Sequence, residues 1–146
     1  TYERYGGSVL ACKRAENDGE YDKYGFVSGQ SEQTGEIKVE RIIEKPGKAN
    51  APSELGSVSE YLFTPELFEY LERASDAFTG HGEFMIQPVV QAMIDDGWGV
   101  YAREISNGKF YDTGDKLEYL KTVIDFGLRD PNFGEQLREH LTEQLK

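Results

Sequence analysis

The stretch EIKVERIIEKP at residues 36–46 decides the fold of this chain. Apolar and charged side chains alternate over residues 36–40, as expected for a strand with one buried face. The alternation slips at residues 42–43, and a slip of one residue is what a β-bulge produces. Glu44 and Lys45 then end the strand before a proline turns the chain. This pattern predicts a strand that carries two charged side chains to the edge of a sheet.

Short elements of both kinds surround this strand. Further strands are expected at residues 8–12, 24–28, 56–63, 100–105 and 109–111, and helices after residues 64, 87, 115 and 131. The dipeptide Asn107-Gly108 predicts a hairpin turn between the last two strands. Strands mixed with helices predict an α/β or α+β protein with a mixed sheet and helices at its C-terminal end.

Two of the expected helices carry specific packing predictions. The helix after Thr64, with Thr64 as its N-cap, is expected to bury Leu67, Phe68 and Leu71. In the last helix, leucines repeat every four residues after Phe133, a narrow apolar stripe with polar faces beside it. That stripe, made of Phe133, Leu137, Leu141 and Leu145, is expected to dock on another apolar surface.

Composition excludes several classes of protein. The chain has 146 residues, of which 38% are hydrophobic, enough for one folded domain. Its formal net charge of −11 argues against nucleic acid or an anionic membrane as a partner. The single cysteine, Cys12, excludes an internal disulfide and a zinc site built on several cysteines, and it fits a reducing compartment.

Four residues are candidates for substrate binding. Lys45 has the reach to meet a phosphate, and Glu44 can accept hydrogen bonds from hydroxyl groups. Gly25 begins a strand, where the missing side chain lets the backbone approach a ligand. Glu83 precedes a helix, where it can meet a ligand or favour the helix dipole. Taken singly, each has a plain structural alternative, namely a solvated charge pair, a tight turn or a stabilised helix start.

Asp112 is the candidate metal ligand. It is expected where a strand ends and a helix is about to begin, a place from which a carboxylate can hold a divalent ion over phosphates. The structural alternative is a capped turn, because Asp115 and Glu118 fit a capping box. Both can hold, since Asp115 can cap the helix while Asp112 faces a site. Cys12 lies in an apolar run, which favours a core position over a nucleophile.

Taken in order, five motifs resemble the sugar-nucleotide pyrophosphorylases, a family of nucleotidyltransferases. They are YGFV at 24–27, VERIIEKP at 39–46, YLFTPELF at 61–68, GEF at 82–84 and YDTGDKLEYLK at 111–121. The last motif is most similar to bacterial members that use UTP and glucose 1-phosphate. Each motif is weak alone, and the specificity comes from their order along nearly the whole chain.

The resemblance implies a Rossmann-like mixed sheet and a reaction that uses Mg²⁺. In that reaction the phosphate of glucose 1-phosphate attacks the α-phosphorus of UTP, giving UDP-glucose and pyrophosphate. It also implies that Glu44 binds sugar hydroxyls, Lys45 binds the sugar phosphate and Gly25 lies close to the sugar. Glu83 joins them as a substrate-binding residue, and Asp112 becomes a magnesium ligand. A cytoplasmic homo-oligomer is expected.

The chain also departs from the family pattern. Its sequence contains no Gly-rich loop that could hold a triphosphate. A second carboxylate ligand for the metal is expected upstream of residue 1. Residues 1–7 look like the end of a helix stopped by glycine. We therefore expect residues 1–146 to be the C-terminal part of one nucleotidyltransferase domain. In this prediction residues 1–114 form the sugar-phosphate side, residues 115–146 form C-terminal helices, and the isolated chain is inactive.

Two alternatives stay open. The first is a related pyrophosphorylase with another base or sugar, because Ser59-Glu60 and Gln87-Pro88 replace residues usual in the family. The second is a non-catalytic domain of the same fold, used for assembly or regulation.

Overall fold

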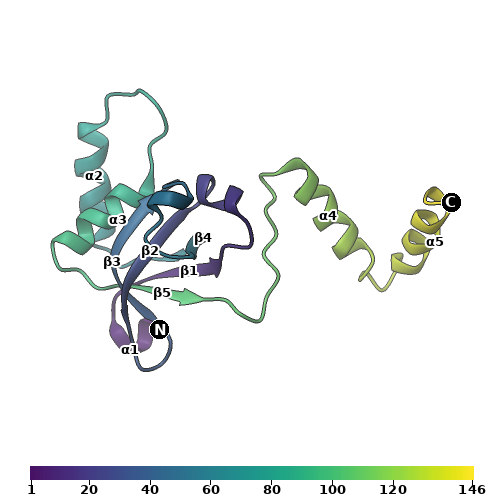
Figure 1. Ribbon diagram of the computed structural model, residues 1–146, viewed down its shortest axis with the longest axis horizontal. Coiled ribbons are helices and arrows are strands. Elements are labelled where there is room, and N and C mark those ends of the chain that lie inside the picture. Colours follow the sequence, from purple (N-terminus) through teal and green to yellow (C-terminus); the bar gives the residue numbers. More distant parts are fainter. The chain divides into compact units, whose positions relative to one another are not determined.

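The computed structural model describes the backbone of residues 1–146 and every side chain except that of Ser59 (Figure 1). The departure from the family pattern at Ser59 therefore lies outside the described side chains. The chain forms two compact units, Thr1–Asn107 and Gly108–Lys146. The expected division into residues 1–114 and 115–146 stays a prediction.

The first unit is built on one mixed sheet. Its strands are β1 (Ser8–Arg14), β2 (Gly25–Ser31), β3 (Ile37–Glu44), β4 (Leu55–Leu62) and β5 (Val100–Glu104). They follow the order β1-β4-β2-β3-β5, and β5 returns to pair with β1, so the sheet closes. Only β1 and β5 run parallel, whereas the other neighbours are antiparallel. The predicted α/β class with a mixed sheet is confirmed.

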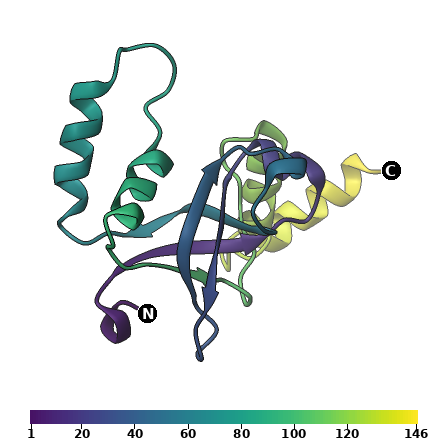
Figure 2. The ribbon, with the colours of Figure 1, turned by 60° about the vertical axis from the view of Figure 1, so that its left-hand side comes forward.

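Two helices cover one side of this sheet. Helix α3 (Ile86–Asp95) packs against β3, and α2 (Leu67–Ala77) packs against α3, as the two views in Figures 1 and 2 agree. Helix α3 turns one apolar face toward the core, where Val89, Val90 and Met93 are buried. Three short helices complete the unit, α1 (Tyr2–Tyr5), η1 (Asp18–Asp22) and η2 (Lys48–Asn50). The predicted glycine stop after the first turn is confirmed by Gly6, whose φ is 68°.

The predicted start of α2 and part of its buried face are wrong. Residues 64–66 form a turn, and the helix begins only at Leu67. Leu67 is buried as expected, but Phe68 is 72% exposed and Tyr70 is buried instead. The buried positions follow the i, i+3, i+4 spacing from Leu67, which leaves the next residue, Phe68, on the outer face.

A bulge in β3 is confirmed, but it lies earlier in the strand than expected. Ser28 and Gly29 of β2 face Arg41 and Val39, so Glu40 is the extra residue on β3. A Cβ on Gly29 would stand 1.9 Å from a backbone carbonyl oxygen of β3. The close approach of the two strands at the bulge therefore requires glycine.

The predicted hairpin at Asn107-Gly108 is wrong. No strand follows β5, and the described backbone of residues 105–112 contains neither strand nor helix. Lys109 forms a hydrogen-bonded ion pair with Asp125, and the Tyr111 hydroxyl donates to the same carboxylate at 3.3 Å. These contacts attach residues 109–111 to a helix later in the chain. The turn sequence had predicted that the same residues pair with a strand. Asp112 consequently does not end a strand.

The second unit consists of α4 (Lys116–Gly127) and α5 (Gly134–Gln144). A Cβ on Gly127 would stand 2.6 Å from Leu137 Cδ2 and 3.8 Å from a ring carbon of Phe133. The first half of the apolar stripe of α5 therefore docks on the C-terminal end of α4. The far end of the stripe is open, because Leu145 is 87% exposed.

This contact predicts how α5 responds to charge. Leu137→Glu should loosen α5 from α4 and cost about 1–3 kcal/mol, because a carboxylate would replace a packed leucine. Gln136→Glu adds the same charge to an exposed position of α5 outside the stripe and should leave stability unchanged. Circular dichroism melting curves of both variants measure the difference. Equal melting temperatures for the two variants would contradict this packing. Light scattering of a Leu141→Glu variant measures the mass of the particle in solution, and a lower mass than that of the wild type would show that the stripe docks on a second subunit.

Candidate substrate-binding site

Gly25 and Glu44 form the base of the site. They are paired residues of the antiparallel strands β2 and β3, so their backbones lie side by side. A Cβ on Gly25 would stand 3.0 Å from Glu44 Oε2 and 2.9 Å from Gln87 Cγ. Glycine at this position therefore leaves room for two polar side chains to converge over the backbone of β2.

Glu44 carries a carboxylate in a costly environment. Its side chain is only 15% exposed, and Oε2 is buried without a hydrogen-bond partner among the described residues. Burial raises the pKa of Glu44, and the nearby Lys45 ammonium opposes this without cancelling it. Buried polar atoms of native proteins nearly always have a hydrogen-bond partner. A ligand hydroxyl that donates to Glu44 Oε2 would provide such a partner.

Lys45 turns away from the strand toward two carboxylates. Its φ of 44° is left-handed, a conformation that non-glycine residues rarely adopt and that clusters at functional sites. Its Nζ lies 3.7 Å from Glu44 Oε1 and 3.4 Å from Glu83 Oε2. The structure thus brings together the four residues singled out as substrate-binding candidates, Gly25, Glu44, Lys45 and Glu83.

The buried charge of Glu44 predicts a cost to the free energy of unfolding that depends on pH. The folded-state pKa is raised, so the protein is relatively favoured at acid pH and loses this stability as pH rises through that pKa. Glu44→Gln removes the charge and should raise the free energy of unfolding near neutral pH by about 1 kcal/mol. The gain should shrink as pH falls below the usual range for glutamate.

Urea denaturation at several pH values measures this gain. Glu69→Gln is the matched control, because Glu69 is exposed on α2 and loses the same charge without burial. A stability gain for Glu44→Gln that is the same at acid and neutral pH would contradict the buried-charge explanation.

Two glutamines of α3 were not predicted as site residues. Gln87 extends toward the point above Gly25 where the Glu44 carboxylate also lies. Gln91 lies four residues later, and its side chain accepts from Ile42 N at 2.8 Å and donates to the Glu40 carbonyl at 3.2 Å. Their i, i+4 spacing on a helix with a buried face was the available signal, but such residues are usually assigned to solvent.

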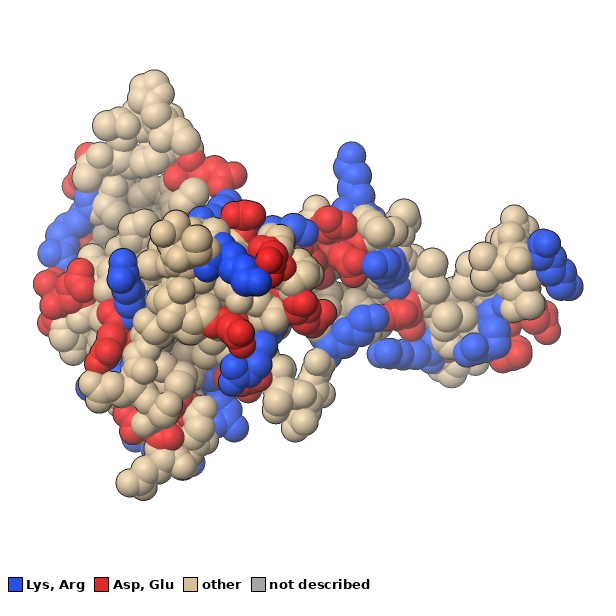
Figure 3. Space-filling model, viewed as in Figure 1, with Lys and Arg blue, Asp and Glu red and all other residues tan. Residues whose placement is uncertain are grey.

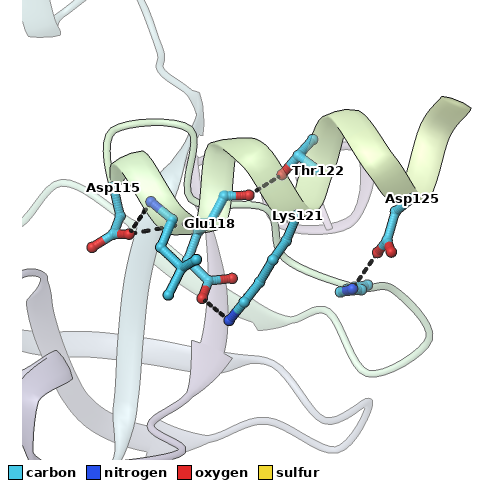
Figure 4. Close-up of polar contacts among 7 residues, drawn as sticks. Asp115, Glu118, Lys121, Thr122 and Asp125 are labelled. Carbon is cyan, nitrogen blue, oxygen red and sulfur yellow. Dashed lines mark hydrogen bonds and ion pairs between the residues drawn. The ribbon is translucent and has the colours of Figure 1, made fainter. Parts of the chain in front are cut away.

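Asp112 belongs to the second unit and lies in a capped turn. Its Oδ1 accepts a hydrogen bond from Gly114 N at 3.1 Å. The predicted cap is confirmed, because Asp115 Oδ1 accepts from Leu117 N and Glu118 N (Figure 4). The Glu118 carboxylate forms an ion pair with Lys121 at 2.7 Å.

Other chemical groups are accounted for by the fold. Cys12 is fully buried in the core, and this burial raises the pKa of its thiol to about 12, as expected of a core residue. Acidic and basic side chains are interspersed over the face shown in Figure 3. Within the described part of the chain, no helix is both long and apolar enough to cross a bilayer.

The site and the fold define a class of protein. The chain belongs to the nucleotidyl transferase family, whose family model matches residues 3–126. Within the family it is similar to the UTP–glucose-1-phosphate uridylyltransferase of Streptococcus pneumoniae serotype 4, with 34% identity over 97% of this chain and 46% of that protein. The enzyme of the same name from Staphylococcus epidermidis is 29% identical over 97% of this chain and 48% of its own length.

Solved structures agree with these relatives. The UTP-bound UGPase from Acinetobacter baumannii superposes with a TM-score of 0.78 at 26% identity, covering 97% of this chain and 47% of that one. A UDP-glucose pyrophosphorylase complexed with UDP-glucose gives a TM-score of 0.78 at 25% identity, covering 88% of this chain and 47% of that one. The predicted family is confirmed, and the chain spans about half the length of the curated relatives it matches.

Proposed function

We propose that this chain is the sugar-phosphate half of an enzyme that transfers a uridylyl group from UTP to glucose 1-phosphate. The observation that carries the proposal is the convergence of Gly25, Glu44, Lys45 and Glu83, with Glu44 Oε2 buried and unpaired. The similarity to proteins named for this reaction, and to structures bound to UTP and UDP-glucose, supports it. The assignment to the C-terminal half stays a prediction.

A sugar 1-phosphate satisfies each group of the site. Its hydroxyls donate hydrogen bonds to Glu44 and Glu83, which as carboxylates can only accept. Its phosphate gives Lys45 an anionic partner, while the absence of a side chain on Gly25 lets the sugar approach the backbone of β2. Bound in this way, the phosphate oxygen is aligned to attack the α-phosphorus of UTP. A new P–O bond forms as the bond to pyrophosphate breaks, and alignment is the main contribution of these residues.

A divalent cation fits this proposal, and we assign it as Mg²⁺. Family members generally use a divalent metal. Mg²⁺ in such sites is commonly held by one or two carboxylates together with substrate phosphates and water, so a single carboxylate such as Asp112 is a sufficient protein ligand from this chain. The ion neutralises charge on the phosphates when it is bound.

Lys45→Ala tests the proposed function. The variant should weaken the binding of glucose 1-phosphate by about tenfold to a hundredfold, because a charge-assisted contact to phosphate is lost. UTP affinity should change little. Calorimetric titration of the intact enzyme with each substrate measures both effects, and product analysis with other nucleotides and sugars decides the alternative substrates.

The control for Lys45→Ala lies three residues further along. Lys48 is exposed and pairs with Asp18 at 2.6 Å, so Lys48→Ala removes an equal charge outside the site. Equal losses of affinity for glucose 1-phosphate and UTP in Lys45→Ala would show that Lys45 belongs to a structural charge pair. A wild-type enzyme that binds neither substrate would favour a non-catalytic role in assembly or regulation.

We also propose a cytoplasmic homo-oligomer. The single buried cysteine suits a reducing compartment. The exposed end of the apolar stripe on α5, at Leu145, is available for a contact between subunits.

A further inference from the structure

Gln87 and Glu44 approach the same point in the site. Measured from the position that a Cβ on Gly25 would occupy, Gln87 Nε2 lies at 3.4 Å and Glu44 Oε2 at 3.0 Å. Both side chains therefore reach the same space over the backbone of Gly25, one from α3 and the other from β3. The carboxylate oxygen there is buried and has no hydrogen-bond partner among the described residues.

The position of Gln87 is fixed by the next turn of the same helix. Gln91 accepts from Ile42 N at 2.8 Å and donates to the Glu40 carbonyl at 3.2 Å and to Asp95 Oδ1 at 2.8 Å. The Gln91 amide forms hydrogen bonds with the backbone of β3 that the peptide group of a neighbouring strand would otherwise form. It can do so because β3 pairs with β5 only at Ile37 and Lys38. The first turn of α3 is thus anchored to the strand that carries Glu44.

We propose that Gln87 determines which hexose 1-phosphate this site accepts. The inference rests on the proposed function and assigns specificity to a residue outside the four described above. A carboxylate only accepts hydrogen bonds, whereas a carboxamide both donates and accepts. A sugar hydroxyl placed between them donates to Glu44 and accepts from Gln87, and this arrangement fixes the direction of that hydroxyl.

An epimer with the hydroxyl in the other orientation loses both hydrogen bonds. It also leaves the buried Glu44 carboxylate unpaired, the situation in which polar sites reject analogues most strongly. Glu44 alone cannot make this distinction as sharply, because its oxygens accept from hydroxyls over a broad range of directions. The carboxamide donor is therefore the feature that the experiment must remove.

The test compares wild-type and variant full-length enzyme with glucose 1-phosphate and its epimers galactose 1-phosphate and mannose 1-phosphate. For each sugar, kcat/KM is measured from pyrophosphate release at saturating UTP and Mg²⁺. Gln87→Met and Gln87→Glu both remove the donor at similar size, and each should reduce the preference for glucose over at least one epimer by about tenfold. The KM for UTP should not change.

Gln33→Met is the control, because Gln33 is exposed in the turn between β2 and β3. Circular dichroism melting confirms that each variant is folded. Preferences within about twofold of wild type for both epimers would overturn the role of Gln87. If the wild-type enzyme uses none of the three sugars, the proposed function itself fails, so the two failures are distinguishable.

Discussion

Replacing Asp112 with asparagine is expected to reduce the turnover of the intact enzyme by about a hundredfold to a thousandfold. The change removes the negative charge that we assign to a divalent cation, and such cations contribute several kcal/mol to charge stabilisation in phosphate chemistry. The turn itself should survive, because an asparagine Oδ1 can still accept the hydrogen bond that Gly114 N donates at 3.1 Å. Raising the Mg²⁺ concentration should restore only part of the activity.

A binding measurement separates a metal ligand from a merely structural residue. Mn²⁺ titration followed by electron paramagnetic resonance reports the affinity for the ion without turnover, and Asp112→Asn should weaken it. Asp130→Asn is a close control, because Asp130 Oδ1 accepts from Asn132 N at 2.8 Å in a similar local turn. Unchanged Mn²⁺ affinity, together with normal turnover at limiting Mg²⁺, would exclude a metal role for Asp112.

The local sequence singles out individual candidate residues but does not specify their arrangement. Glu44, Lys45 and Gly25 are candidates because strand ends and glycines are features of the local sequence. The strand register then explains why Gly25 and Glu44 meet. Glu83 lies 3.4 Å from Lys45 although the chain between them includes β4 and α2. No periodicity in the sequence specifies such a distance, which is set by the packing of α3 on β3.

Long-range side-chain contacts also explain the incorrect hairpin. Asn107-Gly108 is a strong local turn signal, but a hairpin requires that the following residues pair with β5. Lys109 and Tyr111 instead bind Asp125 of α4. The contacts of a charged and an aromatic side chain with a helix override the turn propensity, and the sequence pattern gave no indication of that partner.

Gln91 illustrates a different limit of sequence analysis. Its amide replaces the missing strand partner at the Ile42 amide and the Glu40 carbonyl. A glutamine on the border of an apolar helix face is normally interpreted as solvent-facing, so its role became visible only when β3 and α3 were placed together. The position of Gln87 over Gly25, one turn earlier, likewise became visible only when β3 and α3 were placed together.

The isolated 146-residue chain is expected to make no detectable UDP-glucose. Its sequence lacks the Gly-rich loop that, by resemblance to the family, holds the triphosphate of UTP. The developing charge on the α-phosphate of UTP would therefore have little to stabilise it. The chain should still bind glucose 1-phosphate, because Gly25, Glu44, Lys45 and Glu83 all lie in its first compact unit.

Pyrophosphate release from UTP, glucose 1-phosphate and Mg²⁺ measures this directly. The assay is repeated after the part of a full-length relative that this chain does not cover is added in trans, which should supply the triphosphate-binding groups and restore measurable turnover. Calorimetric titration with glucose 1-phosphate shows whether the isolated chain is folded and competent, so inactivity cannot be attributed to unfolding. Robust turnover by the chain alone would mean that its own residues hold the triphosphate, and the division of the site into a nucleotide half and a sugar half would be wrong.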